Sequence, residues 1–591
     1  MKAEAKSFNF LSLEGMVKIP FFQRTYVWDK DNWENLLSEL LNKPSGHFLG
    51  SIILKQLLSP SGEPKQLEVI DGQQRLTTLS ILLKALYDTF PSEIQKNCEK
   101  NIKDILFYRE DCTGQNYAIK IEHSQVDADV YQNIIEANID NNPTINQITE
   151  NSHKMLQCYQ YFYDELKNKS DEIKKSLLNK ILNSENKMLV VIDLVEESDD
   201  EQAIFDTLNT AGVRLSPAEI IKNALFQRII QKSSKKTAID LYKQTWEKIF
   251  LQDEDTIKYW DNERQTGRFK RDNIEILLHC FAIIKGFYDP DKHALSDLSK
   301  LYKAEIANRD SKEKLEELLN EIIEYAKVYQ EKIITFDKSM LFPFNDDIKR
   351  LLHILEVLEI STFHPFILFV FKKYQDESRK NIFLNLEKFI VRRMIAQKET
   401  KNYNKDCKTF IKNPDAILNK IETTDEEISN GIRKISNKNA ALLLFWIELY
   451  RRNRNERYDI KELKYTYSLE HIMPQKWEEY WKDIPQKTNP DGLPMTEEET
   501  KRDRSNKIYW IGNMTLLTSS LNSALHNYAF EKKMNGEGRK KGIKAYAELS
   551  ITKEDIVEPY DKGDRNWDEE KIIKRTNNLE QEIMKIWNLQ G

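Results

Sequence analysis

A short strand that ends in a carboxylate and an imidazole constrains this chain more than any other feature. Residues 465–469 alternate polar and apolar side chains, which is typical of a half-buried strand, and Glu470 and His471 follow directly. A neutral imidazole can accept a proton from water near pH 7, and a carboxylate oxygen can hold a hard divalent cation. Because hydrolysis of a phosphodiester uses both groups, the pair predicts a site for this chemistry at the strand end.

Two asparagines downstream extend the pattern. Asn522 lies at the start of a helix predicted over 522–533, where its amide oxygen can act as a second metal ligand. Asn513 lies in the preceding loop, where its amide can hold the loop and steady His471. A Glu-His pair alone is also common on protein surfaces without any function, so the prediction depends on the combination.

The order of these groups resembles the ββα-metal or HNH nuclease motif, and in particular the matching element of CRISPR-associated HNH nucleases. Glu470 stands where Asp is more usual. The resemblance implies that His471 is the general base, that Asn513 supports it, and that Glu470 and Asn522 hold one Mg²⁺ or Mn²⁺ ion. His526 is a weaker candidate for a substrate contact.

A second pattern lies near the N-terminus. An apolar strand over 67–70 leads into the turn 71–75 (Asp-Gly-Gln-Gln-Arg) and a helix over 76–87. Such a turn presents free backbone N–H groups at the positive end of the helix dipole, which favours phosphate binding. An ordinary structural turn is the alternative. Arg24, within the aromatic run 19–28, is similarly either a phosphate ligand or a member of a buried ion pair.

Residues 19–28, 47–54 and 69–79 together resemble the N-terminal domain of GmrSD-type, modification-dependent type IV restriction endonucleases, whose Asp-Gly-Gln-Gln-Arg turn marks a ParB/sulfiredoxin-like fold. Segments 205–216 and 220–223 resemble the later motif of that domain, with Ala211 where the family commonly has Arg. The region 467–587 resembles the nuclease domain of the same family. The spacing of Trp567, Ile572, Leu579, Ile583 and Trp587 predicts an amphipathic final helix that packs on this domain.

This resemblance implies binding and hydrolysis of a nucleoside triphosphate and sensing of modified DNA. It does not distinguish GTP, ATP and UTP. Gln73 and Arg75 are expected to take part in hydrolysis. The implied nucleotide ligands are Arg24, Asp71, Gly72, Gln73, Gln74, Arg75 and Thr77.

The rest of the chain predicts a mainly helical α+β protein. Its 591 residues include only 17 Gly and 16 Pro, which favours helices over a turn-rich β architecture. We expect a nucleotide-binding sensor domain over 1–235, a helical spacer over 236–440 and the HNH domain over 441–591. The spacer has no catalytic signature and is a candidate homodimer surface. Its histidines, including His353, are expected in the core.

Charge and targeting signals narrow the class of protein further. No signal peptide or membrane span is evident, and five scattered cysteines favour a reducing compartment, so a soluble, cytoplasmic protein without membrane contact is expected. The net charge of −6 means that a DNA-binding surface must be local. Candidate basic clusters lie at 451–454, 501–504 and 539–541.

These observations predict a modification-dependent endonuclease that cuts double-stranded phage DNA and couples this cleavage to nucleotide hydrolysis. One alternative is a nucleotide-switched DNA-binding module whose nuclease end is vestigial. Another is a nuclease toxin directed at RNA, which would use the same chemistry on a different substrate.

Overall fold

The computed structural model describes most of the chain. The described residues are 2–44, 47–57, 64–110, 116–123, 125–137, 149, 152–194, 216–266, 269–333, 336–482, 487–488, 493–538 and 540–588. They form two compact units, Met1–Gln244 with Ile306–Leu315, and Thr245–Glu305 with Glu316–Gly591. The functional domain limits expected at 235 and 440 stay predictions.

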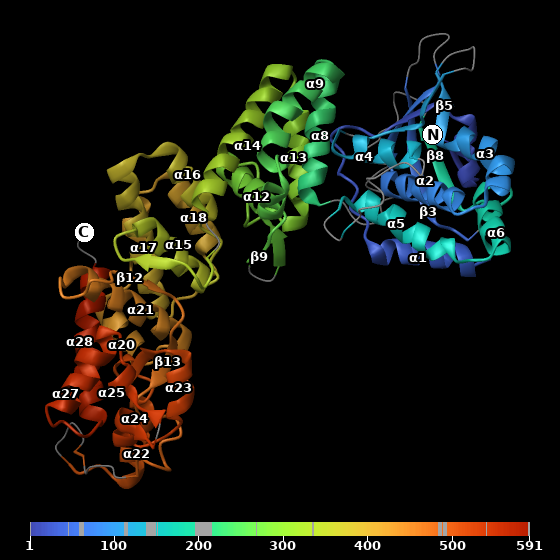
Figure 1. Cartoon of the computed structure of the whole chain (residues 1–591). Helices are drawn as coiled ribbons and strands as arrows, with labels where there is room; N and C mark the ends of the chain where they lie inside the picture. The colour runs from blue at the N-terminus through green and yellow to red at the C-terminus, as the bar shows by residue number, and fades with distance from the viewer. Residues whose placement is uncertain are drawn as a thin grey trace. The chain divides into compact units, whose positions relative to one another are not determined.

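The first unit contains a mixed six-stranded sheet of order β1-β8-β3-β4-β2-β7 (Figure 1). β8 pairs antiparallel with β1 and parallel with β3, while β3 and β4 are antiparallel. β2 is parallel to both β4 and β7. The strands are β1 (Lys2–Lys6), β2 (Met16–Lys18), β3 (Gly50–Leu57), β4 (Gln66–Asp71), β7 (Ile121–Glu122) and β8 (Leu189–Leu194).

The strand and the helix predicted on either side of residues 71–75 are present, but the helix starts three residues earlier than predicted, so residues 73–75 are helical. β4 ends at Asp71, Gly72 adopts the left-handed conformation (φ 92°), and α2 (Gln73–Asp88) starts at once. Only a residue that tolerates positive φ can make this reversal without strain, which explains the glycine. Residues 73 to 86 of α2 are all buried, so α2 is the central helix of this unit.

The other helices of the first unit pack around α2 and the sheet. α5 is the main neighbour of α2, and it also contacts α1 and α4. The N-cap of α1, Asp29, forms a capping box with Asn32. These helices are α1 (Lys30–Asn42), α3 (Ser92–Leu106), α4 (Gln125–Glu136), α5 (Lys154–Lys167), α6 (Asp171–Leu182), α8 (Pro217–Lys232) and α9 (Lys235–Tyr242).

The second unit is mainly helical, as expected. Its first helices are α10 (Lys248–Phe250), α11 (Glu254–Trp260), α12 (Asn273–Lys285), α13 (Leu298–Ala307), α14 (Lys312–Lys332), α15 (Asp347–Val357), α16 (His364–Lys373) and α17 (Asp376–Ile395). Its later helices are α18 (Tyr403–Lys412), α19 (Ala416–Lys420), α20 (Asp425–Ile432), α21 (Asn437–Arg454), α22 (Glu497–Lys507), α23 (Ser519–Leu525), α24 (Phe530–Asn535), α25 (Ile543–Tyr546), α26 (Ser550–Thr552), α27 (Glu558–Asp561) and α28 (Glu569–Ile586).

Two short strands carry the sequence pattern of interest in this unit. β13 (Ser468–His471) pairs antiparallel with β14 (Met514–Leu517), so that Glu470 faces Thr515 and His471 faces Met514 across the ladder. α23 follows β14 after Thr518. The strand-strand-helix order thus brings the residues around 470, 513 and 522 into one region.

The single helix predicted over 522–533 is wrong. The chain forms α23, leaves the helical conformation at His526 (φ 43°), and starts α24 at Phe530. Leu525 and Phe530, on either side of this break, are both buried in one apolar cluster. Burial of both side chains therefore outweighs the local preference for an unbroken helix.

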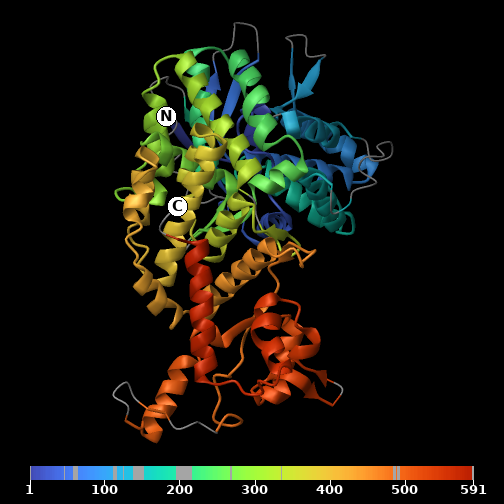
Figure 2. The ribbon, with the colours of Figure 1, turned by 90° about the vertical axis from the view of Figure 1, so that its left-hand side faces the viewer.

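The amphipathic final helix is confirmed as α28, the long red helix in Figure 2. Ile572, Leu579 and Ile583 are buried, and so is Arg575. α28 packs against the short turn η6 (Ile511–Asn513), α20 and α21. Gly512 permits this close approach, because a Cβ atom there would lie 2.2 Å from the carbonyl oxygen of Ile572. Among the described residues, no helix is long and apolar enough to cross a membrane.

Candidate functional site

His471 lies at the end of β13 with its imidazole largely buried, at 9% exposure. Its Nδ1 is 3.1 Å from the carbonyl oxygen of Ile508. A carbonyl can only accept, so Nδ1 carries the proton and donates this bond. Burial lowers the pKa of His471 below its ordinary value, with the Ile508 contact opposing the shift. The ring is therefore neutral at pH 7, and its Nε2 lone pair is available to accept a proton.

Asn513 is fully buried and holds the backbone around His471. Its Oδ1 accepts the backbone N–H of Met473 at 2.9 Å and the indole N–H of Trp567 at 3.1 Å. Its Nδ2 donates to the carbonyl oxygens of Met473 at 2.8 Å and Ile508 at 3.0 Å. The carbonyl that orients His471 is thus itself held by Asn513, as in the second layer of many metal and catalytic sites.

Asn437, which the sequence analysis did not single out, contacts the other nitrogen of His471. Its Oδ1, an acceptor, is 3.2 Å from Nε2, and the residue lies at the exposed first position of α21. With Nδ1 protonated and the ring neutral, this contact is a hydrogen bond only if the Asn437 NH₂ group faces Nε2. Nothing in its local sequence distinguishes Asn437 from other helix-starting asparagines.

Glu470 is paired with a buried cation. The Lys533 Nζ on α24 donates to its Oε1 at 2.5 Å and to the carbonyl oxygen of His471 at 2.8 Å. Burial raises the pKa of Glu470, and the Lys533 charge opposes this rise. The sequence analysis missed Lys533, because the break between α23 and α24 is what brings it to β13.

Asn522 lies on α23 beside the same strand. Its Nδ2 donates to the hydroxyl of Ser468 at 3.0 Å and to the carbonyl oxygen of Leu469 at 2.9 Å. Because the NH₂ side of the amide is used in this way, Oδ1 is its remaining ligand atom. One carboxylate and one amide oxygen are donors that suit a hard cation such as Mg²⁺ or Mn²⁺. No three His, Cys, Asp or Glu side chains gather as a metal site anywhere in the described part of the chain.

Three arginines of the basic clusters expected to bind DNA are paired with acidic residues inside the fold, whereas Arg454, Lys501 and Arg502 are exposed. Arg451 forms ion pairs with Asp555 and Glu582, and Arg504 is buried against Glu569. Arg452 is also buried and pairs with Glu448. The expectation that these three arginines form a DNA surface is therefore wrong. Acidic residues distant in sequence neutralise Arg451 and Arg504, and Glu448, four residues away on α21, neutralises Arg452. In the third cluster, residue 539 lies outside the described residues.

In the first unit, both glutamines of the turn hold the segment around Arg24. The Gln73 amide nitrogen donates to the carbonyl oxygen of Arg24. Gln74 Oε1 accepts the backbone N–H of Val27 at 2.9 Å, and its Nε2 donates to the carbonyl oxygen of Thr25 at 3.0 Å. The turn and the aromatic run are thus parts of one substructure.

Arg75 lies within the fold. Its Nη1 donates to the carbonyl oxygen of Ser51 at 2.7 Å, and its guanidinium covers Gly50. Burial lowers the pKa of Arg75 and the charge of Asp71 opposes this change, while burial raises the pKa of Asp71. Thr77 is also buried, and its hydroxyl is 3.2 Å from His123 Nε2.

A further cation lies close to Arg24. Lys222 on α8 is buried, which lowers its pKa to about 8; Glu219 opposes this shift and the Arg24 charge adds to it. The positive charges of Arg75 and Arg24 both oppose the rise in the pKa of Asp71. The structure therefore brings together the predicted residues Arg24, Asp71 and Arg75 with the segment 220–223. Of the other motif, residues 205–215 lie outside the described residues.

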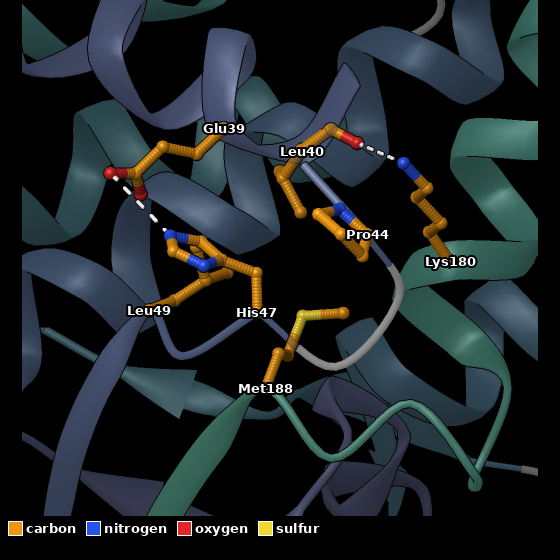
Figure 3. A pocket seen from close by; sticks show the side chains of 7 residues that line it. All are labelled: Glu39, Leu40, Pro44, His47, Leu49, Lys180 and Met188. Atoms are coloured by element: carbon orange, nitrogen blue, oxygen red, sulfur yellow. Dashed lines mark hydrogen bonds and ion pairs between the residues drawn. The ribbon is translucent and has the colours of Figure 1, made fainter. Parts of the chain in front are cut away.

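The described residues of the first unit line a larger and a smaller cavity. The larger, of about 270 Å³, lies between β3, β4 and α8, and Phe22, Gln23, Ile70 and Asn223 are among its lining residues. None of the seven predicted nucleotide ligands lines it. The smaller is shown in Figure 3 and lies between His47, Glu39, Lys180 and Met188. Its volume of about 10 Å³ holds one water molecule at most, so it is a packing feature.

The two ends of the chain match two related family models. Residues 7–226 match the N-terminal domain of the GmrSD restriction endonuclease, and residues 419–582 match the C-terminal domain of GmrSD restriction endonucleases. No curated protein matches the chain. The first match contains the turn at 71–75, and the second contains His471, Asn513, Asn522 and Lys533. The chain belongs to the GmrSD restriction endonuclease family.

Proposed function

We propose that the protein is a modification-dependent DNA endonuclease of the type IV restriction kind, acting in defence against phage. Membership of a restriction endonuclease family implies DNA as the substrate. The proposed catalytic element is the β13-β14-α23 segment, as a ββα-metal (HNH) nuclease. The observation that carries this proposal is the arrangement of Glu470, His471 and Asn522 around one strand end, with Asn513 beneath them.

In the proposed reaction His471 is the general base. Its Nδ1–H bond to Ile508 fixes the ring, and Nε2 takes the proton from the attacking water. The contact between Asn437 and Nε2 has to break before this proton transfer. Glu470 and Asn522 would hold a divalent ion, which supplies charge stabilisation for the phosphate and the leaving oxygen.

In the first unit, with a sheet we interpret as ParB/sulfiredoxin-like, we place nucleoside triphosphate binding at the turn of residues 71–75. The support is that Arg75 and Arg24 lie near Asp71, at the N-terminus of α2, and that Lys222 lies close to Arg24. Three cationic side chains in one buried region favour a polyanionic ligand. Hydrolysis in this unit is proposed to control cleavage by the other.

The decisive experiment compares wild-type protein and His471→Ala on plasmid DNA and on RNA, with Mg²⁺ or with a chelator. Metal-dependent cleavage of DNA by the wild type alone is expected. Preferential degradation of RNA would instead identify an RNA-directed toxin, and cleavage of neither substrate would favour a DNA-binding module with a vestigial nuclease. Repeating the assay on unmodified and modified phage DNA, with and without GTP, ATP or UTP, tests the dependence on modification and nucleotide.

A further inference from the structure

Lys533 places a buried positive charge directly against the proposed metal ligand. Its side chain is 0% exposed, and its Nζ donates to Glu470 Oε1 at 2.5 Å and to the His471 carbonyl oxygen at 2.8 Å. An ammonium group is costly to bury unless it is paired and hydrogen-bonded. This lysine therefore has a fixed position next to the site, unlike a mobile surface lysine.

The positive charge of Lys533 cancels the negative charge of Glu470 at the proposed metal site. Glu470 contributes one negative charge and Lys533 one positive charge, while Asn522 and the neutral His471 contribute none. Divalent cations are held mainly by anionic oxygens, and the repulsion from a nearby ammonium is strong in a buried environment. Within the described ranges, no group of three or more His, Cys, Asp and Glu side chains is placed to hold a metal ion there.

We propose that Lys533 makes metal binding conditional on DNA binding. In the free protein, the Glu470–Lys533 pair leaves the proposed metal site with no net negative charge to attract Mg²⁺ or Mn²⁺. A phosphate of bound DNA supplies the missing charge, so metal and DNA bind cooperatively, and by linkage each raises the affinity of the other by the same factor. This inference rests on the proposed nuclease function and adds an electrostatic control to it.

The test measures Mn²⁺ affinity by electron paramagnetic resonance on the full chain, in a His471→Ala background that prevents cleavage. A short DNA duplex is added at a concentration that saturates the protein by fluorescence anisotropy, and Mn²⁺ bound by DNA alone is subtracted. We expect the duplex to tighten Mn²⁺ binding at least tenfold. Adding Lys533→Met should tighten binding in the absence of DNA at least tenfold, and adding Glu470→Gln to that variant should abolish it.

The matched control is Lys532→Met, which removes a charge one residue away that pairs with Glu537 instead of Glu470. It should leave the Mn²⁺ affinity unchanged. If Lys533→Met does not fold, Lys533→Gln keeps a polar donor without the charge and should give the same tightening. A Mn²⁺ affinity independent of DNA, or equal in the protein with and without Lys533, would overturn the inference.

Metal-dependent nicking of plasmid by the wild-type chain is measured in parallel. If the wild type nicks DNA but the Mn²⁺ affinity depends neither on Lys533 nor on DNA, only the proposed effect of Lys533 on metal binding is wrong. If the wild type nicks no DNA under any condition, the proposed nuclease function fails, and the inference that rests on it fails as well.

Discussion

The indole nitrogen of Trp567 donates to Asn513 Oδ1 at 3.1 Å, and the same oxygen accepts the backbone N–H of Met473 at 2.9 Å. Trp567 lies just before α28, so the last helix of the chain is connected through Asn513 to the loop that orients His471. The final segment thus contributes to the site although none of its residues is proposed to touch the substrate.

Replacing Asn513 should destabilise the second unit as well as reduce cleavage. Asn513→Ala leaves buried groups of Met473 and Trp567 without partners, and such groups cost about 1–3 kcal/mol each. The Ile508 carbonyl loses one of its two donors and keeps His471 Nδ1. We expect a loss of at least about 2 kcal/mol in urea unfolding followed by tryptophan fluorescence. Trp567→Phe removes one bond only and should cost about 1 kcal/mol. Equal losses for the two variants would contradict this ranking.

His471→Ala should abolish DNA cleavage and leave nucleotide hydrolysis and folding intact. Loss of a general base typically reduces a rate by about 10² to 10⁴-fold. His526→Ala is the matched control, because His526 is exposed and contacts the ring of Tyr528, and it should retain cleavage within a few-fold. Single-turnover rates on plasmid measure both. Substantial cleavage by His471→Ala would remove His471 from this role.

A buried histidine in the helical part should make the protein sensitive to acid. His353 is 3% exposed among aromatic rings, its Nδ1 has no hydrogen-bond partner, and burial lowers its pKa to about 3. In the unfolded chain this histidine has a pKa of about 6.5, so as the pH drops it is protonated in the unfolded chain before it is protonated in the folded one. The free energy of unfolding therefore falls as the pH drops below that value. The contribution of His353 to this loss is about 1 kcal/mol at pH 5.5.

His353→Phe should therefore reduce the loss of stability between pH 7 and pH 5.5 by about 1 kcal/mol. Urea midpoints at the two pH values give the comparison. An unchanged pH dependence in His353→Phe would show that this histidine is not neutral in the folded state.

The close contact between Arg75 and Gly50 predicts a non-additive pair of substitutions. Gly50 has φ 127°, and a Cβ atom there would lie 2.4 Å from Arg75 Cζ. Gly50→Ala should destabilise the first unit by about 2 kcal/mol, through backbone strain and this overlap. In the double variant with Arg75→Ala the overlap is relieved, so the combined loss should be smaller than the sum of the single losses. Strict additivity would contradict the contact.

Nucleotide binding and DNA cleavage should be coupled. Arg75→Ala should lose triphosphate affinity in isothermal titration and also change the rate at which modified DNA is cut. Coupling energies of this kind are typically about 1–3 kcal/mol, and they are reciprocal for binding. Modified DNA should therefore change nucleotide affinity by the same factor. Unchanged affinities together with wild-type cleavage by Arg75→Ala would show two independent activities on one chain.

The sequence by itself determined several local elements of the two candidate sites, but not the break in the helix at His526. The alternation before Glu470, the glycine in the turn after β4 and the apolar spacing of α28 were sufficient, because strand and helix periodicity and turn chemistry depend on neighbouring residues. The family could also be identified from such local motifs, and the match of the two terminal regions confirms it.

Only the tertiary structure decided which charged and polar groups meet. Lys533 reaches Glu470 because the helix breaks at His526, and Asn437 reaches His471 from a helix that starts 34 residues earlier. Arg451 and Arg504, which look like a DNA surface in the sequence, are neutralised by acidic residues far along the chain. The physical reason is that the burial and pairing of a charge depend on the side chains that packing brings beside it, and these come from segments whose local patterns carry no information about one another.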